Sequence, residues 1–187
     1  MKRSSPPRGA SGAKAGLTVL ELSVMTTLFL VALIAFSRSV KSAVDLGNTS
    51  HESAIAREAI RRILESMSAV SFDEAFALYN SDPSDDLDGP GTADGSSFSV
   101  GGLQPLSDDA DGMVGEIVLP EDQLVFALRE DIIDARIGMP RDLDLDGVID
   151  GEDHSGNYRV LPVYVRIEWR GPTGPRELMA RTILGDR

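Results

Sequence analysis

The longest apolar stretch of the chain lies near its start, from Leu17 to Phe36, and Leu22 to Ser37 contains no charged residue. One acidic residue, Glu21, lies just before the uncharged part. A helix over residues 17–37 would be about 30 Å long, which is enough to cross the core of a bilayer. An isolated carboxylate in hydrocarbon is costly, so we expect Glu21 to have a functional partner.

A second helical pattern follows from Ser39 to about Leu78. Apolar residues recur near the 3.6-residue period of an α-helix, and the opposite face is charged, which predicts an amphipathic half-helix that packs on a sheet. These apolar residues are Val40, Val44, Ile55, Ala59, Ile63, Met67 and Val70. Residues 46–50 interrupt the pattern, and Gly47 weakens a helix by about 1 kcal/mol relative to Ala. This segment is either a tolerated imperfection or a place where the helix bends.

The remaining chain alternates between acidic loops and short apolar runs. Residues 81–97 and 107–112 are rich in Asp, Gly and Pro or Ser, which is typical of exposed loops. The apolar or alternating runs predict strands at 98–100, 113–119, 124–128, 163–169 and 178–184. The sequence Gly-Pro-Thr-Gly-Pro at 171–175 predicts a hairpin between the last two. One long N-terminal helix followed by an antiparallel sheet is an α+β fold.

Charge sets the expected topology of the chain. The 187 residues include no cysteine, so a disulfide framework and thiolate metal sites are excluded. Residues 1–16 hold four of the 18 basic residues and no acidic one, so the remaining 14 basic and 30 acidic residues give a formal charge of −16. This charge argues against nucleic-acid binding. Lys and Arg beside a membrane span stay in the cytoplasm, so we expect the body from Ser39 onward to be exported.

The basic leader, Gly16, the acid at Glu21 and the uncharged helix together resemble the signal of type IV pilins and pseudopilins. In that family a prepilin peptidase cuts after the Gly and the new N-terminus is methylated. The resemblance implies cleavage between Gly16 and Leu17, N-methylation of Leu17, and Glu21 as the fifth mature residue, where it serves assembly. Leu17 stands where Phe is usual in the family. A plain signal anchor or a secretory signal is the alternative, although a secretory signal has no acid inside its apolar run.

The resemblance also implies an organisation and a function. Residues 1–16 would be the leader, 17–38 the transmembrane and filament-core helix, and 39–187 an exported, pilin-like domain in a ladle-shaped molecule. The protein would be a minor pilin or pseudopilin of a type IV pilus or type II secretion system, single-pass in the inner membrane. Its partners would be the prepilin peptidase and other pilin or pseudopilin subunits. The alternative is a membrane-anchored, calcium-dependent binding module that joins no filament.

Residues 142–153, Asp-Leu-Asp-Leu-Asp-Gly-Val-Ile-Asp-Gly-Glu-Asp, resemble the calcium loop of EF-hand proteins. The resemblance implies a structural Ca²⁺ bound by the side chains or carbonyl of Asp142, Asp144, Asp146, Val148, Asp150 and Asp153. Gly147 would allow the sharp turn, and Ile149 would tuck into the core. Asp153 stands where Glu is usual, and the flanking residues do not favour helices. We therefore expect a single loop between strands, with an acidic surface turn as the alternative.

Catalysis has little support in the sequence. His51 lies in the predicted helix and His154 in a loop, and no Ser-His-Asp arrangement is evident. We therefore expect a structural or binding protein and no enzyme.

Overall fold

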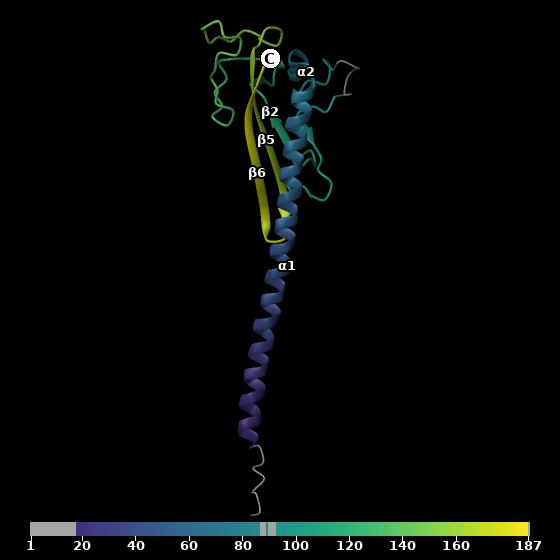
Figure 1. The fold of residues 1–187 in the computed structure, drawn as a ribbon, viewed down its shortest axis with the longest axis vertical. Coiled ribbons are helices and arrows are strands. Elements are labelled where there is room, and N and C mark those ends of the chain that lie inside the picture. Colours follow the sequence, from purple (N-terminus) through teal and green to yellow (C-terminus); the bar gives the residue numbers. More distant parts are fainter. Residues whose placement is uncertain (1–17, 87–88, 90–92, 187) are drawn as a thin grey trace, which may run out of the picture. The chain divides into compact units, whose positions relative to one another are not determined.

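The computed structural model describes residues 18–86, 89 and 93–186 (Figure 1). The expected cleavage site, Gly16 and Leu17, therefore lies outside the described residues. The chain divides into two compact units, Met1–Val44 and Asp45–Arg187. Helix α1, Val19–Ala69, begins in the first unit and ends in the second.

The second unit contains a four-stranded antiparallel sheet with the strand order β1-β2-β5-β6 (Figure 1). Its strands are β1 Ser97–Phe98, β2 Gly115–Val118, β5 Val160–Gly171 and β6 Gly174–Gly185. A separate two-stranded ladder pairs β3, Glu121–Asp122, with β4, Ala127–Leu128. One long helix packed on an antiparallel sheet confirms the α+β class expected from the sequence.

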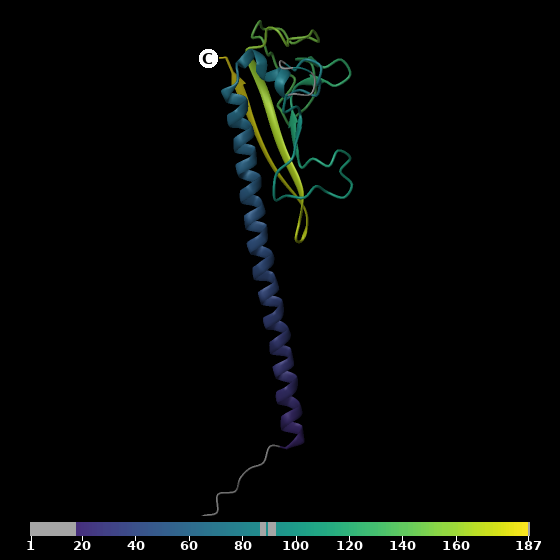
Figure 2. The same cartoon turned by 90° about the vertical axis from the view of Figure 1, so that its right-hand side faces the viewer.

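The longest ladder of the sheet is the hairpin of β5 and β6, in which Gly171 pairs with Gly174 across the predicted turn. Val163, Val165 and Ile167 of β5 are fully buried in the same core as apolar residues of the second half of α1. Figure 2 shows that half of α1 running beside the hairpin. The Trp169 indole N–H also donates to Glu52 of α1 at 3.0 Å. The amphipathic pattern therefore packs on the sheet as the sequence predicts.

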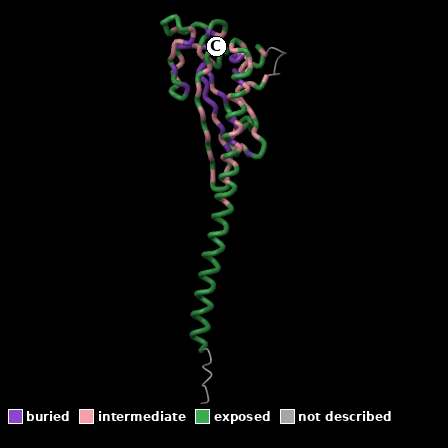
Figure 3. The backbone as a smooth tube through the Cα atoms, viewed as in Figure 1, coloured by how far each residue is buried: buried purple, intermediate pink, exposed green. Residues whose placement is uncertain are grey.

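Helix α1 exposes every residue from its start at 19 to 44 (Figure 3). Among the described residues it is the one helix long and apolar enough to cross a membrane, and none of its apolar window is buried. Large apolar side chains such as Phe29 and Phe36, each 67% exposed, need a non-aqueous environment or a partner to cover them. This exposure fits a single-pass membrane anchor, and a signal sequence has the same character.

The helix ends earlier than the sequence predicts. It stops at Ala69 and is followed by a 3₁₀ turn at Phe72–Glu74 and the short helix α2, Ala75–Tyr79. Tyr158 explains the break, because its hydroxyl donates to the Phe72 carbonyl and accepts the Phe76 N–H at 3.2 Å. The periodicity of apolar residues around position 70 could not predict this contact, because Tyr158 lies 86 residues beyond Phe72. By contrast, Gly47 does not interrupt the helix.

One predicted strand is much shorter in the structure. The run 124–128 contributes only β4, while Leu124 and Val125 are 91% and 66% exposed. The N–H groups of Val125 and Phe126 both donate to the Asp122 carbonyl, at 3.2 and 2.7 Å, so the run forms a turn. An apolar run with no partner strand along its full length does not form a strand.

We predict that Tyr158→Phe lowers the free energy of unfolding of the full-length protein in detergent by about 1–3 kcal/mol. The substitution leaves the Phe72 carbonyl and the Phe76 N–H without their shared partner. Denaturant unfolding followed by circular dichroism measures the change.

Tyr164→Phe is the matched control for this prediction. Tyr164 is as buried as Tyr158, at 6% exposure, but among the described residues its hydroxyl donates to the Met179 sulfur alone, at 3.4 Å. Because sulfur is a weak acceptor, we expect a clearly smaller loss. Equal losses in the two variants would show that the Tyr158 hydroxyl does not stabilise the break after α1.

Candidate functional site

The acidic trio, Asp142, Asp144 and Asp146, forms one side-chain group. One carboxylate oxygen from each residue lies within 4.8 Å of the others. The group is held by backbone donors, since Asp142 accepts the N–H of Leu145 at 2.6 Å and of Gly147 at 2.9 Å. Spacing at every second residue therefore brings the three predicted carboxylates together.

The turn of this loop needs left-handed backbone at two positions. Gly147 has a φ of +91° and Leu145 a φ of +65°. Gly adopts this region without a steric cost, which agrees with the role expected for Gly147. The expectation for Ile149 is wrong, because its side chain is 49% exposed. Leu143 is fully buried instead, and it fixes the loop to the core from the loop's second residue.

The other predicted ligands lie elsewhere. The Asp150 carboxylate accepts the Glu152 N–H at 2.8 Å and faces His154. Asp153 accepts the N–H groups of Leu128 and Ser155, at 3.2 and 3.0 Å. Among the described residues, neither belongs to the group formed by the acidic trio. Asp150 and Asp153 remain predicted ligands. The loop would have to change its conformation to bring their carboxylates to the trio.

Val148 is exposed, and its N–H donates to Asp146 at 2.7 Å. Three carboxylates supply oxygen ligands of the kind that a hard dication such as Ca²⁺ takes, although Ca²⁺ needs 6–8 of them. The donor set of the trio therefore fits the expected ion.

Glu130 holds the loop through hydrogen bonds to its backbone. No motif identifies this residue in the sequence. Its carboxylate, 1% exposed, accepts the N–H of Leu143 at 2.5 Å and more distantly those of Asp144 and Asp150, both at 3.3 Å. One buried acid thus orders two separate parts of the loop. Only the folded path of the chain brings it there, so sequence reasoning missed it.

His154 is the second residue near this loop that sequence reasoning did not single out. It is 6% exposed and lies among three carboxylates, with Nε2 3.1 Å from Asp150 and 3.8 Å from Glu130, and Nδ1 3.6 Å from Asp144. Burial lowers the pKa of His154, but the hydrogen bond to Asp150 and the charges of Glu130 and Asp144 outweigh burial, so its pKa lies above the ordinary value.

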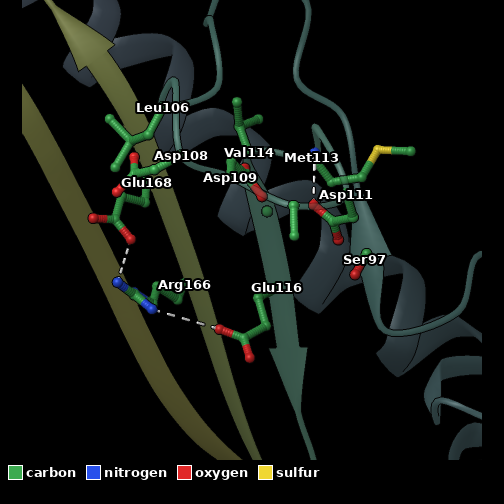
Figure 4. Close-up of a pocket in the computed structure, with 12 residues that line it drawn as sticks. Ser97, Leu106, Asp108, Asp109, Asp111, Met113, Val114, Glu116, Arg166 and Glu168 are labelled. Atoms are coloured by element: carbon green, nitrogen blue, oxygen red, sulfur yellow. Dashed lines mark hydrogen bonds and ion pairs between the residues drawn. The ribbon is translucent and has the colours of Figure 1, made fainter.

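A separate shallow pocket of about 460 Å³ lies against the sheet (Figure 4). Arg166 lies at its wall between Glu168 and Glu116, and the Arg166–Glu116 separation is 3.7 Å. Asp108, Asp109 and Asp111 contribute further acids to the lining. Exposed ion pairs of this kind contribute at most about 1 kcal/mol. The pocket brings together no group of metal-ligating atoms among the described residues, so we favour the loop as the functional site.

At the start of the described chain, Thr18 caps helix α1. Its hydroxyl accepts the Glu21 N–H at 3.2 Å, and its carbonyl accepts the Leu22 N–H at 3.0 Å. A Thr followed three residues later by Glu is the pattern of a capping box. Glu21 itself is exposed among the described residues, which is consistent with a helix-start role and leaves its carboxylate accessible.

Comparison with known proteins gave no match to a family model, to a curated protein or to a solved structure.

We predict that, in metal-free protein, NMR titration gives His154 a pKa above its ordinary value near 6.5. Asp150→Asn should lower that pKa, because it removes a negative charge from the Nε2 hydrogen bond. Because the pKa is raised in the folded state, the protonated imidazole stabilises the fold fully below the unfolded pKa. This stabilisation is lost as the pH rises through the folded pKa. A His154 pKa below 6.5, or one that Asp150→Asn leaves unchanged, would contradict the carboxylate environment.

Proposed function

We propose that the chain is a structural subunit, a minor pilin or pseudopilin, of a type IV pilus or type II secretion system. The observation that carries the proposal is the combined signal of basic leader, Gly16, Glu21 and uncharged helix. The structure is consistent with such a subunit, since residues 18–44 expose an apolar helix and the second half of α1 packs on a sheet. In this proposal α1 anchors the subunit in the inner membrane before assembly, with the domain outside the cytoplasm.

Glu21 has a specific role in this proposal. A charge moved into an apolar helix bundle costs several kcal/mol unless it is paired. Because Glu21 is exposed among the described residues, we expect this partner to come from another molecule. The new N-terminal amine that cleavage would create at Leu17 of a neighbouring subunit is a suitable cation. Cleavage and assembly would then be linked through one ion pair.

We further propose that Ca²⁺ binds the acidic trio and acts as a structural clip in the exported domain. The support is the convergence of three carboxylates around a turn that Gly147 permits. Extracytoplasmic calcium sites bind weakly, with Kd of about 10⁻⁴–10⁻³ M, which suits calcium concentrations outside the cytoplasm. The ion would stabilise the long segment between β4 and β5.

We predict that Gly16→Val leaves an uncut precursor in cells that contain a prepilin peptidase. A branched side chain beside the scissile bond blocks the extended approach that Gly allows. Mass spectrometry of the purified protein gives the N-terminus, which in the unaltered chain should be a methylated Leu17.

Gly9→Val is the matched control, because it adds the same side chain within the leader away from the cut. It should be processed normally. Normal processing of Gly16→Val, or a different N-terminus in the unaltered chain, would contradict the pilin proposal and favour a membrane-anchored binding module.

We predict that calcium raises the melting temperature of the full-length protein in detergent relative to chelator. At tenfold Kd, binding to the folded form alone stabilises it by about 1.4 kcal/mol. Asp142→Asn should abolish most of the shift because it removes one charge of the acidic trio. Differential scanning fluorimetry at millimolar calcium measures it.

Glu152→Gln is the control for this experiment. Glu152 is exposed and is not one of the expected ligands, and the substitution removes one negative charge from the same loop, so most of the calcium shift should persist. A shift lost equally in Glu152→Gln would show that calcium responds only to the net charge of the loop. If calcium does not raise the melting temperature of the unaltered protein, the loop is an ordinary acidic turn.

A further inference from the structure

A second group of metal-ligating side chains lies next to the acidic trio and shares Asp144 with it. We call it the His154 cluster: Glu130, Asp144 and His154, whose ligand atoms lie within 4.8 Å of one another. It differs from the trio in burial, because Glu130 is 1% and His154 6% exposed, and the Asp144 side chain is 13% exposed. It also differs in chemistry, because it offers an imidazole nitrogen with two carboxylates. Its residues come from two separate stretches of chain that no motif connects.

The orientation of His154 points to a ligand. Its Nε2 lies 3.1 Å from the Asp150 carboxylate, which makes Nε2 the proton-bearing nitrogen of the neutral ring. That tautomer leaves a lone pair on Nδ1. Nδ1 is buried and has no hydrogen-bond partner, although it lies 3.6 Å from Asp144. A carboxylate that holds one imidazole nitrogen while the other binds metal is the usual support of a histidine ligand.

The backbone of His154 is fixed as firmly as its ring. Its N–H donates to the Leu128 carbonyl at 2.8 Å, and its own carbonyl accepts the N–H groups of Asn157 and Tyr158, each at 3.1 Å. A ring held in this way cannot turn its unpartnered nitrogen to water without breaking the contact with Asp150. The fold therefore keeps Nδ1 buried and without a hydrogen-bond partner.

Glu130 supplies the charge that such a site needs. A buried carboxylate is costly unless a cation compensates it. Backbone N–H groups satisfy its oxygens as hydrogen bonds, but they carry no net charge. Within the described ranges, its ion-pair partner within 4.0 Å is His154 alone, at 3.8 Å. A metal ion between Glu130 and Asp144 would compensate both acids.

We propose that the His154 cluster is a second metal site that takes a first-row transition-metal dication, with Zn²⁺ as its probe. Nitrogen and carboxylate ligands together suit these metals, whereas Ca²⁺ prefers oxygen alone. Two ligands of a tetrahedral metal at about 2.1 Å are about 3.4 Å apart, close to the 3.6 Å between Nδ1 and Asp144. The Nδ1 and Asp144 ligands are thus nearly in place, whereas Glu130 lies 3.8 Å from Nε2 and its carboxylate has to shift toward Nδ1 to join them. Water would complete the coordination.

The two sites meet at Asp144. One of its oxygens accepts the Asp146 N–H within the acidic trio, and the other faces His154 and accepts the side-chain amide of Asn157. When both ions are bound, the Asp144 carboxylate bridges them. This inference does not depend on filament assembly, because it concerns the folded domain whatever the chain joins.

The test is zinc binding by the full-length protein in detergent, stripped with chelator and then dialysed into millimolar calcium. Equilibrium dialysis with elemental analysis should give one Zn²⁺ per chain. His154→Gln should weaken zinc binding at least about tenfold, while the calcium-dependent rise in melting temperature stays. The Gln amide can still donate to Asp150, which keeps the fold.

Asp142→Asn is the matched control, because Asp142 belongs to the trio and not to the His154 cluster. It should lose the calcium response and keep zinc. Zinc binding lost in Asp142→Asn and kept in His154→Gln would overturn the proposal, since zinc would then occupy the acidic trio. Absence of zinc binding to the unaltered protein would overturn it as well.

Spectroscopy of the unaltered protein tests the site even if a variant fails to fold. In protein labelled with ¹⁵N-histidine, zinc should shift the Nδ1 resonance of His154 strongly and leave His51, on α1, unchanged. Co²⁺ in place of zinc should give visible absorption bands of a tetrahedral nitrogen and oxygen site. An unshifted His154 resonance at saturating zinc would exclude the imidazole as a ligand.

Discussion

The second unit, Asp45–Arg187, depends on the burial of one face of β5 against the second half of α1. Val163, Val165 and Ile167 are fully buried there, and burying such a side chain contributes about 1.5–3 kcal/mol. β5 also lies between β2 and β6, so it carries hydrogen-bonded neighbours on both edges. The remaining elements of the sheet take their positions from this strand. The same helix, Val19–Ala69, also contains the exposed apolar residues near the start of the described chain.

The segment between β4 and β5 has a different source of order. Residues 129–159 contain neither helix nor strand, and loops of that length are uncommon unless something else holds them. Here polar groups do so: the Glu130 carboxylate gathers backbone N–H groups, and the Leu143 carbonyl accepts those of Arg159 and Val160 at 2.7 and 3.0 Å. These last bonds tie the loop to the first residue of β5. The geometry of the acidic trio is therefore coupled to the sheet.

Local repetition explains which features were predictable from sequence. The β5–β6 hairpin alternates clearly, and its two strands are neighbours in the chain, so register follows from the short turn. The trio was predictable for the same reason, because its spacing is local. The end of α1 was not, since it depends on Tyr158, 86 residues beyond Phe72. Glu130 and His154 converge only through the path of the loop, and Asp153 turns away to bind the Leu128 N–H.

Charge is the physical reason to expect a cation at this loop. The N–H groups of Leu145 and Gly147 hold Asp142 in place, but dipoles position a carboxylate without neutralising it. Three like charges within a few ångströms repel each other, and the net charge of the body adds to that repulsion. Arg129 does not relieve it, because its guanidinium already pairs with Asp122 and Asp131. A dication delivers two charges at one point, which no side chain of this loop can do.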